Sequence, residues 1–208
     1  MRFSITIAAF FLLPLVSFGQ LVEQNTEFRT LAQIRYSVNN QLQFELVPAT
    51  YFVDGGRDHR MELALRYKPS KRFTIEPGLR MVNLQGSTGL LWRYSLSGQF
   101  NAPKWNRISS SVRLKYSNFA DDQITDKSFL RARGKLSYNV KGIKLNPFVS
   151  AEYFMHSDFS AQYKMRYRLG TTYKFNKHNA IALTYNLDYY LTEYKNNHIA
   201  MVTYQYKF

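Results

Sequence analysis

The sequence contains no cysteine, and this absence excludes several kinds of protein at once. Without thiols there is no disulfide framework, no thiolate metal site, no cysteine nucleophile and no lipid-modified cysteine at a processed N-terminus. Histidine is scarce too: the four histidines show neither HxH nor HExxH spacing, so we expect no metal site and no cofactor. Acidic residues number 14 against 28 Lys and Arg, which gives a net charge of +14. Such a charge first suggests nucleic acid or an anionic surface as the partner.

Beyond the N-terminus, the chain has no apolar run that approaches a transmembrane helix, which needs about 20 residues. At the N-terminus, Met1-Arg2 precedes an apolar stretch from Phe3 to Phe18, and Ser17-Phe18-Gly19 places small residues before Gln20. This pattern predicts a cleaved secretory signal peptide, residues 1–19. An uncleaved membrane anchor is the alternative, but the apolar core is short for a span. The mature chain, residues 20–208, is then a single exported domain.

Apolar and polar residues alternate through almost the whole mature chain, and this is the pattern of β-strands. The segment RMELALRYK, for example, places Met, Leu, Leu and Tyr on one face. The predicted strands are 9–14 residues long, and a tilted transmembrane strand needs about 9–11. Eleven strands are predicted: Thr26–Val38, Gln41–Phe52, Arg60–Lys68, Phe73–Leu84, Leu90–Phe100, Arg107–Asn118, Ser128–Val140, Ile143–Met155, Gln162–Phe175, Ala180–Leu191 and His198–Phe208.

The apolar face of all eleven strands carries no Asp, Glu, Lys or Arg. Strands of a soluble β-sandwich also alternate, but they are usually about 5–6 residues long and guard their edges with charges. A charge-free face rich in Tyr, Phe, Leu and Trp fits contact with lipid better. Because every backbone amide in lipid must be paired internally, such strands must close into a barrel. The predicted fold is therefore an all-β, antiparallel, up-and-down transmembrane β-barrel.

The connections between strands alternate between short and longer, as periplasmic turns and extracellular loops do. Bacterial barrels usually have an even number of strands. Ten to twelve strands are therefore expected, and twelve are favoured if Gln20–Asn25 adds a short strand. Three prolines on the apolar face, Pro48, Pro77 and Pro147, are awkward for a closed ladder and predict bulges or strand ends.

The signal peptide, the alternating strands and a closing aromatic strand with Tyr204, Tyr206 and Phe208 together resemble Gram-negative outer-membrane β-barrels. This resemblance implies a location in the outer membrane, contact with its lipid and lipopolysaccharide, and recognition of the closing aromatics by the barrel-assembly machinery. More narrowly, MRYRLGTTYKF at residues 165–175, followed by NKHN, resembles the domain of unknown function 2490 family. That family comprises outer-membrane barrels with an Arg-x-Arg-x-Gly strand before an Asn-Lys turn. It has no settled activity, so the resemblance implies no catalytic residue.

Most of the positive charge falls on the polar face of the strands, which would line the lumen. A nucleic-acid binder would instead carry its charge on an outer patch with exposed aromatics, so no nucleic acid is expected as a partner. The acids on the same face are fewer: Glu27, Glu45, Glu62, Glu76, Glu152 and Asp188. The basic residues predicted to define the lumen are Arg66, Arg80, Arg93, Arg113, Arg131, Arg133, Lys135, Lys164, Arg166 and Arg168.

Three functions are compatible with such a barrel. The first is a narrow passive pore that favours small anions, because rings of Arg and Lys lower the barrier for anions. The second is a structural or anchoring barrel whose charges pair across the lumen and conduct nothing. The third is a rim enzyme acting on envelope lipid or peptide, with Asp58 and His59, or His156 and Asp158, as its weak candidates. Adjacent residues on a loop more often point apart, so no catalytic residue is assigned.

Overall fold

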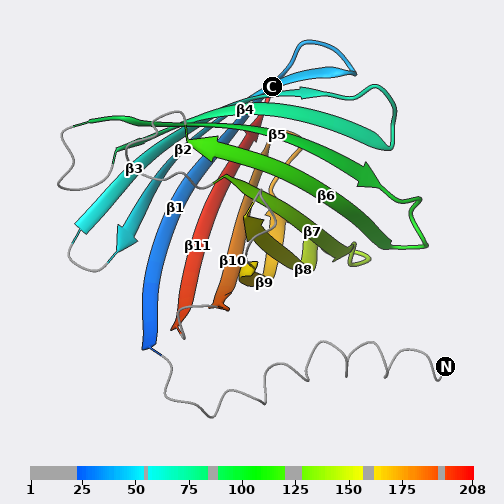
Figure 1. Ribbon diagram of the computed structural model, residues 1–208. Coiled ribbons are helices and arrows are strands. Elements are labelled where there is room, and N and C mark those ends of the chain that lie inside the picture. Colours follow the sequence, from blue (N-terminus) through cyan, green and yellow to red (C-terminus); the bar gives the residue numbers. More distant parts are fainter. Residues whose placement is uncertain (1–22, 54–55, 84–88, 120–127, 157–161, 192–194) are drawn as a thin grey trace.

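The computed structural model describes residues 23–53, 56–83, 89–119, 128–156, 162–191 and 195–208. In these ranges the chain forms a closed barrel in which each strand pairs with its neighbours in sequence and β1 pairs with β11 (Figure 1). The predicted all-β barrel is confirmed. The strands are β1 (Glu23–Ser37), β2 (Leu42–Val53), β3 (Gly56–Tyr67), β4 (Phe73–Asn83), β5 (Leu91–Asn101), β6 (Ile108–Phe119), β7 (Phe129–Tyr138), β8 (Leu145–His156), β9 (Gln162–Lys174), β10 (Asn179–Tyr190) and β11 (Lys195–Lys207).

The barrel has its apolar side chains on the outside and most of its charged ones inside. Leu169 is 60% exposed and Leu114 is 56% exposed, although both lie in the middle of long strands. Their sequence neighbours Arg168 and Arg113 point into the lumen, because successive side chains of a strand point to opposite faces. A soluble protein buries such leucines, so this outer surface is suited to lipid.

The seam that closes the barrel is a parallel pairing of β1 with β11, which lie side by side in Figure 1. The pairing runs from Glu23 opposite Lys195 to Arg35 opposite Lys207. The preference for twelve strands is therefore wrong for the described chain. Residues 23–25 belong to β1 itself, and no place is left for a strand between β1 and β11. An odd number of strands that otherwise alternate in direction necessarily brings the first and last strands together in parallel.

β1 begins at Glu23 rather than Thr26, and two further strands also begin at least three residues earlier than predicted. β3 starts at Gly56 rather than Arg60, and β11 starts at Lys195 rather than His198. In both cases the backbone ladder continues into the expected loop, since Gly56 pairs with Val53 and Lys195 pairs with Glu23. The connection between β2 and β3 shrinks to residues 54–55, and Asp58 and His59 become strand residues.

Pro48 and Pro77 do not end their strands, which corrects the expectation of bulges or strand ends for these two, whereas Pro147 lies two residues from the start of β8 and beyond its ladder to β7, which ends at Phe148. Pro48 lies within β2 and pairs with Met61 of β3, while the ladder to β1 skips the pair that Pro48 would make. Pro77 pairs with Leu96 of β5 in the same way, and the ladder to β3 is interrupted beside it. Proline lacks only the N–H group, so each strand loses pairing on one side and keeps it on the other.

Gly170 in β9 makes room for an aromatic ring. A Cβ atom at this position would lie 2.7 Å from Cζ of Phe148 and 2.8 Å from the carbonyl oxygen of Leu183. We expect Gly170→Ala to lower the free energy of unfolding by about 1–3 kcal/mol, because overpacking forces side chains and backbone apart. Urea unfolding of the folded barrel in detergent measures this loss.

Gly134→Ala is the matched control, since a Cβ atom at Gly134 would meet nothing within 4 Å. Equal losses for the two variants would contradict the steric role of Gly170.

Candidate functional site

The lumen is lined by a dense set of ion pairs. Seven acidic side chains take part in these pairs and are fewer than the cations around them: Glu27, Glu45, Asp58, Glu62, Glu76, Glu152 and Asp188. The excess positive charge predicted for the inner face is thus present, but much of it is already engaged with carboxylates. The pairs form two groups, on opposite walls of the barrel.

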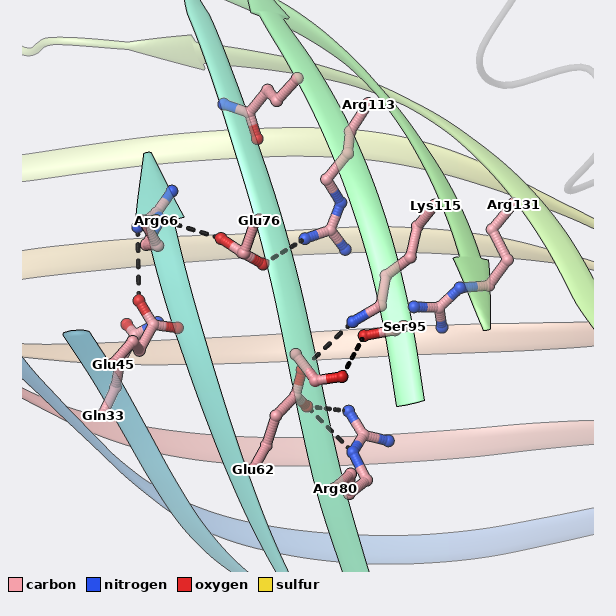
Figure 2. A network of polar contacts seen from close by, with 12 residues as sticks. Gln33, Glu45, Glu62, Arg66, Glu76, Arg80, Ser95, Arg113, Lys115 and Arg131 are labelled. Carbon is pink, nitrogen blue, oxygen red and sulfur yellow. Dashed lines mark hydrogen bonds and ion pairs between the residues drawn. The ribbon is translucent and has the colours of Figure 1, made fainter. Parts of the chain in front are cut away.

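The first group crosses β1 to β6 (Figure 2). Glu45 accepts a hydrogen bond from Nε of Arg35 at 2.6 Å and lies 3.3 Å from Nη1 of Arg66. Arg66 continues the chain to Glu76 at 2.9 Å, and Glu76 lies 3.8 Å from Arg113. Alternating carboxylates and guanidiniums hold one another in place along this wall, which fixes its charged groups relative to the backbone.

We call the end of the barrel where the chain passes from β2 to β3 and from β4 to β5 the loop end. Nearer to this end, Glu62 accepts hydrogen bonds from Nε of Arg80 at 2.9 Å and from Nζ of Lys115 at 3.1 Å (Figure 2). The space left among Glu62, Arg80, Lys115 and their neighbours is only about 10 Å³. A cavity needs about 10–15 Å³ to hold one water molecule, so this cavity has room for at most one.

The opposite wall also carries buried ion pairs. Asp188 of β10 is 1% exposed and accepts hydrogen bonds from Nζ of Lys164 at 2.8 Å and from Nη2 of Arg166 at 2.6 Å. Glu152 of β8 is also buried and lies 3.7 Å from Arg131. We call the residues Glu62, Arg80, Lys115, Arg131, Glu152, Lys164, Arg166 and Asp188 the charged layer.

We call the opposite end, where the chain turns from β1 to β2 and from β3 to β4, the short-turn end. Between the charged layer and the short-turn end lies an open vestibule of about 590 Å³. Its lining includes Arg35, Arg66, Lys104, Arg113, Arg133, Lys135 and Arg168, but only two acids, Glu45 and Glu76. A second hollow of about 740 Å³ at the rim shares Arg35 with the vestibule. It adds four lysines to the rim: Lys144, Lys174, Lys177 and Lys207. Vestibule and rim together form a basic funnel at the short-turn end.

The structure places all ten predicted lumen cations on inward-facing positions of the strands, but in different surroundings. Six are in ion pairs: Arg66, Arg80, Arg113, Arg131, Lys164 and Arg166. Arg93 donates to the hydroxyl of Ser117 at 2.7 Å. The last three, Arg133, Lys135 and Arg168, line the vestibule and have no ion pair within the described ranges.

Sequence reasoning missed two inner-surface residues. Phe148 lies beneath Nζ of Lys135, 4.1 Å from the ring centroid, and Asn186 accepts a hydrogen bond from Nε of Arg168 at 2.6 Å. Asp58 also faces the lumen, where it pairs with Arg60 at 3.0 Å. Alternation extended through β3 and β8 could have identified Asp58 and Phe148 as inward residues.

The structure separates the first pair of rim candidates. Asp58 is buried in the lumen, whereas the exposed His59 points outward and its Nδ1 lies 3.3 Å from the hydroxyl of Thr50. Adjacent residues of a strand face opposite sides, so Asp58 cannot orient His59. His156 ends β8 and its ring lies 5.1 Å from that of Phe129, while Asp158 lies outside the described residues. In the part of the chain that is described, no group of three His, Asp or Glu side chains could hold a metal ion.

The closing aromatics lie at the short-turn end, beside the seam. Phe208 donates its backbone N–H to the carbonyl of Arg35 at 2.9 Å, and its ring packs edge-on against Tyr206 at 4.6 Å. Tyr204 lies on the outer face of β11 and is hydrogen-bonded to Asn179. Their role as an assembly signal stays a prediction.

The described residues include no helix that is long and apolar enough to cross a membrane.

Comparison with known proteins gives a likeness in fold. No family model matches the chain, so the resemblance to the domain of unknown function 2490 family stays untested, and no curated protein matches either. Among solved structures, the barrel is similar to one described as the NanC porin in a rhombohedral crystal form. The TM-score is 0.54 at 11% sequence identity, over 77% of this chain and 84% of the other. At this identity the likeness concerns the fold: the chain is a closed barrel of porin-like architecture.

Proposed function

We propose that the protein is an outer-membrane β-barrel and a narrow passive pore that favours small anions. The observation that carries this proposal is the basic funnel, in which cations outnumber acids from the rim to the charged layer. The exposed apolar outer surface supports the location in a membrane, and the porin-like fold is compatible with passage through the lumen. Export through a cleaved signal peptide of residues 1–19, which lie outside the described ranges, belongs to the same proposal.

Anion preference follows from electrostatics. A cleft lined by charge of one sign between low-dielectric walls raises the local concentration of the opposite ion. Anions entering the funnel meet Arg133, Lys135 and Arg168, whose charge no carboxylate of the described chain neutralises in an ion pair. Cations meet the same groups as a barrier.

The charged layer sets the limit on passage. The gap among Glu62, Arg80, Lys115 and Arg131 of the layer is about 10 Å³, so an ion passes between these side chains only when their ion pairs exchange partners or shift. We therefore expect small, discrete current steps rather than the large steady conductance of a wide porin. Eleven strands place the barrel between filled eight-strand barrels and open sixteen-strand porins.

The filled layer also favours a second candidate, a structural barrel that conducts nothing. The two candidates differ in one measurement, the current through a planar bilayer that contains the refolded mature protein. In a KCl gradient, we expect discrete steps and a reversal potential biased toward chloride. A folded, heat-modifiable barrel that stays electrically silent would overturn the pore and leave the structural barrel.

Arg133→Glu tests whether the vestibule determines ion preference. Replacing a cation with an acid at the vestibule wall should move the reversal potential toward that of potassium, because the local barrier for cations falls. Lys71→Glu makes the same charge change in the exposed turn between β3 and β4 and should leave the reversal potential unchanged. Equal shifts in the two variants would mean that overall charge, and not the lumen, sets the preference.

A further inference from the structure

We propose that the vestibule contains a binding site for a dianionic oxyanion of the phosphate-monoester class, formed by Arg133, Lys135 and Arg168 beside Phe148. The inference names a ligand for the proposed pore and rests on the proposed function for its role in permeation. Binding itself can be measured without any current.

The site is built from three adjacent strands. Lys135 of β7, Ser150 of β8 and Arg168 of β9 lie directly opposite one another in the sheet. Two strand spacings, about 10 Å, separate Lys135 from Arg168, so both long side chains can reach one small ligand between them. Both cations line the vestibule, and Ser150 between them is buried.

Arg133 adds a third cation, two residues before Lys135 on β7 and therefore on the same inner face. It lies directly opposite Arg113 of β6 on one side and opposite Glu152 of β8 on the other, and the ion pair of Glu152 is with Arg131. Like charges in this arrangement are destabilising unless a counter-charge lies between them. Arg113 has only a 3.8 Å contact to Glu76, which is shared with Arg66, and its buried Nε makes no hydrogen bond within the described chain.

The held guanidinium of Arg168 and the surplus of cations in the vestibule both favour a ligand with two negative charges. Nε of Arg168 donates to Asn186, and the edge formed by the two terminal nitrogens of the same guanidinium is the one that would make a planar, bidentate contact with an oxyanion. The surplus of cations over the two vestibule carboxylates exceeds what one monoanion neutralises. A phosphate monoester supplies up to two charges and three acceptor oxygens.

Phe148 supplies an apolar surface on the short-turn side of the cations. It lies two residues before Ser150 on β8, directly opposite Ser137 of β7 on one side and Gly170 of β9 on the other. Its ring packs against Gly170, which fixes the ring in place. The ring can contact the organic group of a monoester while the phosphate meets Lys135 and Arg168. A free inorganic anion would make no use of this surface.

Isothermal titration calorimetry of the folded mature protein in nanodiscs tests the site, with methyl phosphate as the ligand and acetate as a monoanionic comparator. We expect methyl phosphate to bind at least tenfold more tightly than acetate at equal ionic strength. Lys135→Gln and Arg168→Gln should each weaken methyl phosphate binding at least tenfold, since a lost charge-assisted hydrogen bond has about this effect. Lys71→Gln, in an exposed turn, should leave the affinity unchanged.

Equal affinities for methyl phosphate and acetate in the wild-type protein would overturn the inference, and this comparison needs no variant to fold. Equal methyl phosphate affinities in the wild type and both lumen variants would also overturn it. If chloride-selective current persisted in either case, the proposed pore would stand without this site. Specific binding in a barrel that is silent in the bilayer would keep the site and overturn the pore.

Discussion

Asp188→Asn should lower the free energy of unfolding by about 3 kcal/mol or more, because it removes the shared partner of two buried cations. Asp188 is 1% exposed, and its carboxylate accepts hydrogen bonds from both Lys164 and Arg166. Asparagine keeps the shape and one acceptor oxygen but removes the charge. The two cations are then left close together without the carboxylate that they share, and the charged layer must admit water or anions.

Urea unfolding in detergent, followed by tryptophan fluorescence, measures this loss. Glu27→Gln is the matched control, since the side chain of Glu27 is 16% exposed and pairs with a single cation, Arg29. We expect a smaller loss for that variant, because it deprives one cation of its carboxylate instead of two. In the Asp188→Asn background, Lys164→Met should recover part of the stability by removing one uncompensated charge. Equal losses for Asp188→Asn and Glu27→Gln would contradict a dry charged layer.

Leu169→Arg should destabilise the barrel by about 2–4 kcal/mol in lipid vesicles, the cost of an arginine near the bilayer midplane. Leu169 lies in the middle of β9 and points outward, 60% exposed. If lipid surrounds this surface, the guanidinium must be drawn into hydrocarbon or must distort the bilayer. If water surrounded it, the same substitution would be nearly neutral, because an exposed arginine is well solvated.

Gln99→Arg provides the control, because Gln99 lines the vestibule and an additional cation there stays hydrated. The free energy of unfolding should change little in this variant. The measurement is urea unfolding from vesicles, with the two arginine variants compared under the same conditions. A loss for Leu169→Arg no larger than that for Gln99→Arg would argue against a membrane-embedded outer surface.

The sequence by itself determined where the eleven strands lie along the chain and which side of each faces outward, but not the strand number of the closed barrel, for which twelve was wrongly preferred. Alternation is a property of a single strand, because successive side chains must point to opposite faces. It can therefore be read locally, and it placed Arg133, Lys135 and Arg168 on the inner face before any contact was known. Strand ends were less secure: β3 continued to Gly56 because its partner strand supplied hydrogen bonds that local sequence does not encode.

Only the tertiary structure decided how the barrel closes and how its lumen is filled. The parallel seam depends on β1 meeting β11, at opposite ends of the described chain. The charged layer depends on contacts such as Glu62 with Lys115, which are 53 residues apart. Alternation assigns a side chain to the inner face but not to a partner across it. Pairing in the lumen is set by the stagger and curvature of the closed sheet, and that geometry separates the paired charges of the layer from the cations that face the vestibule.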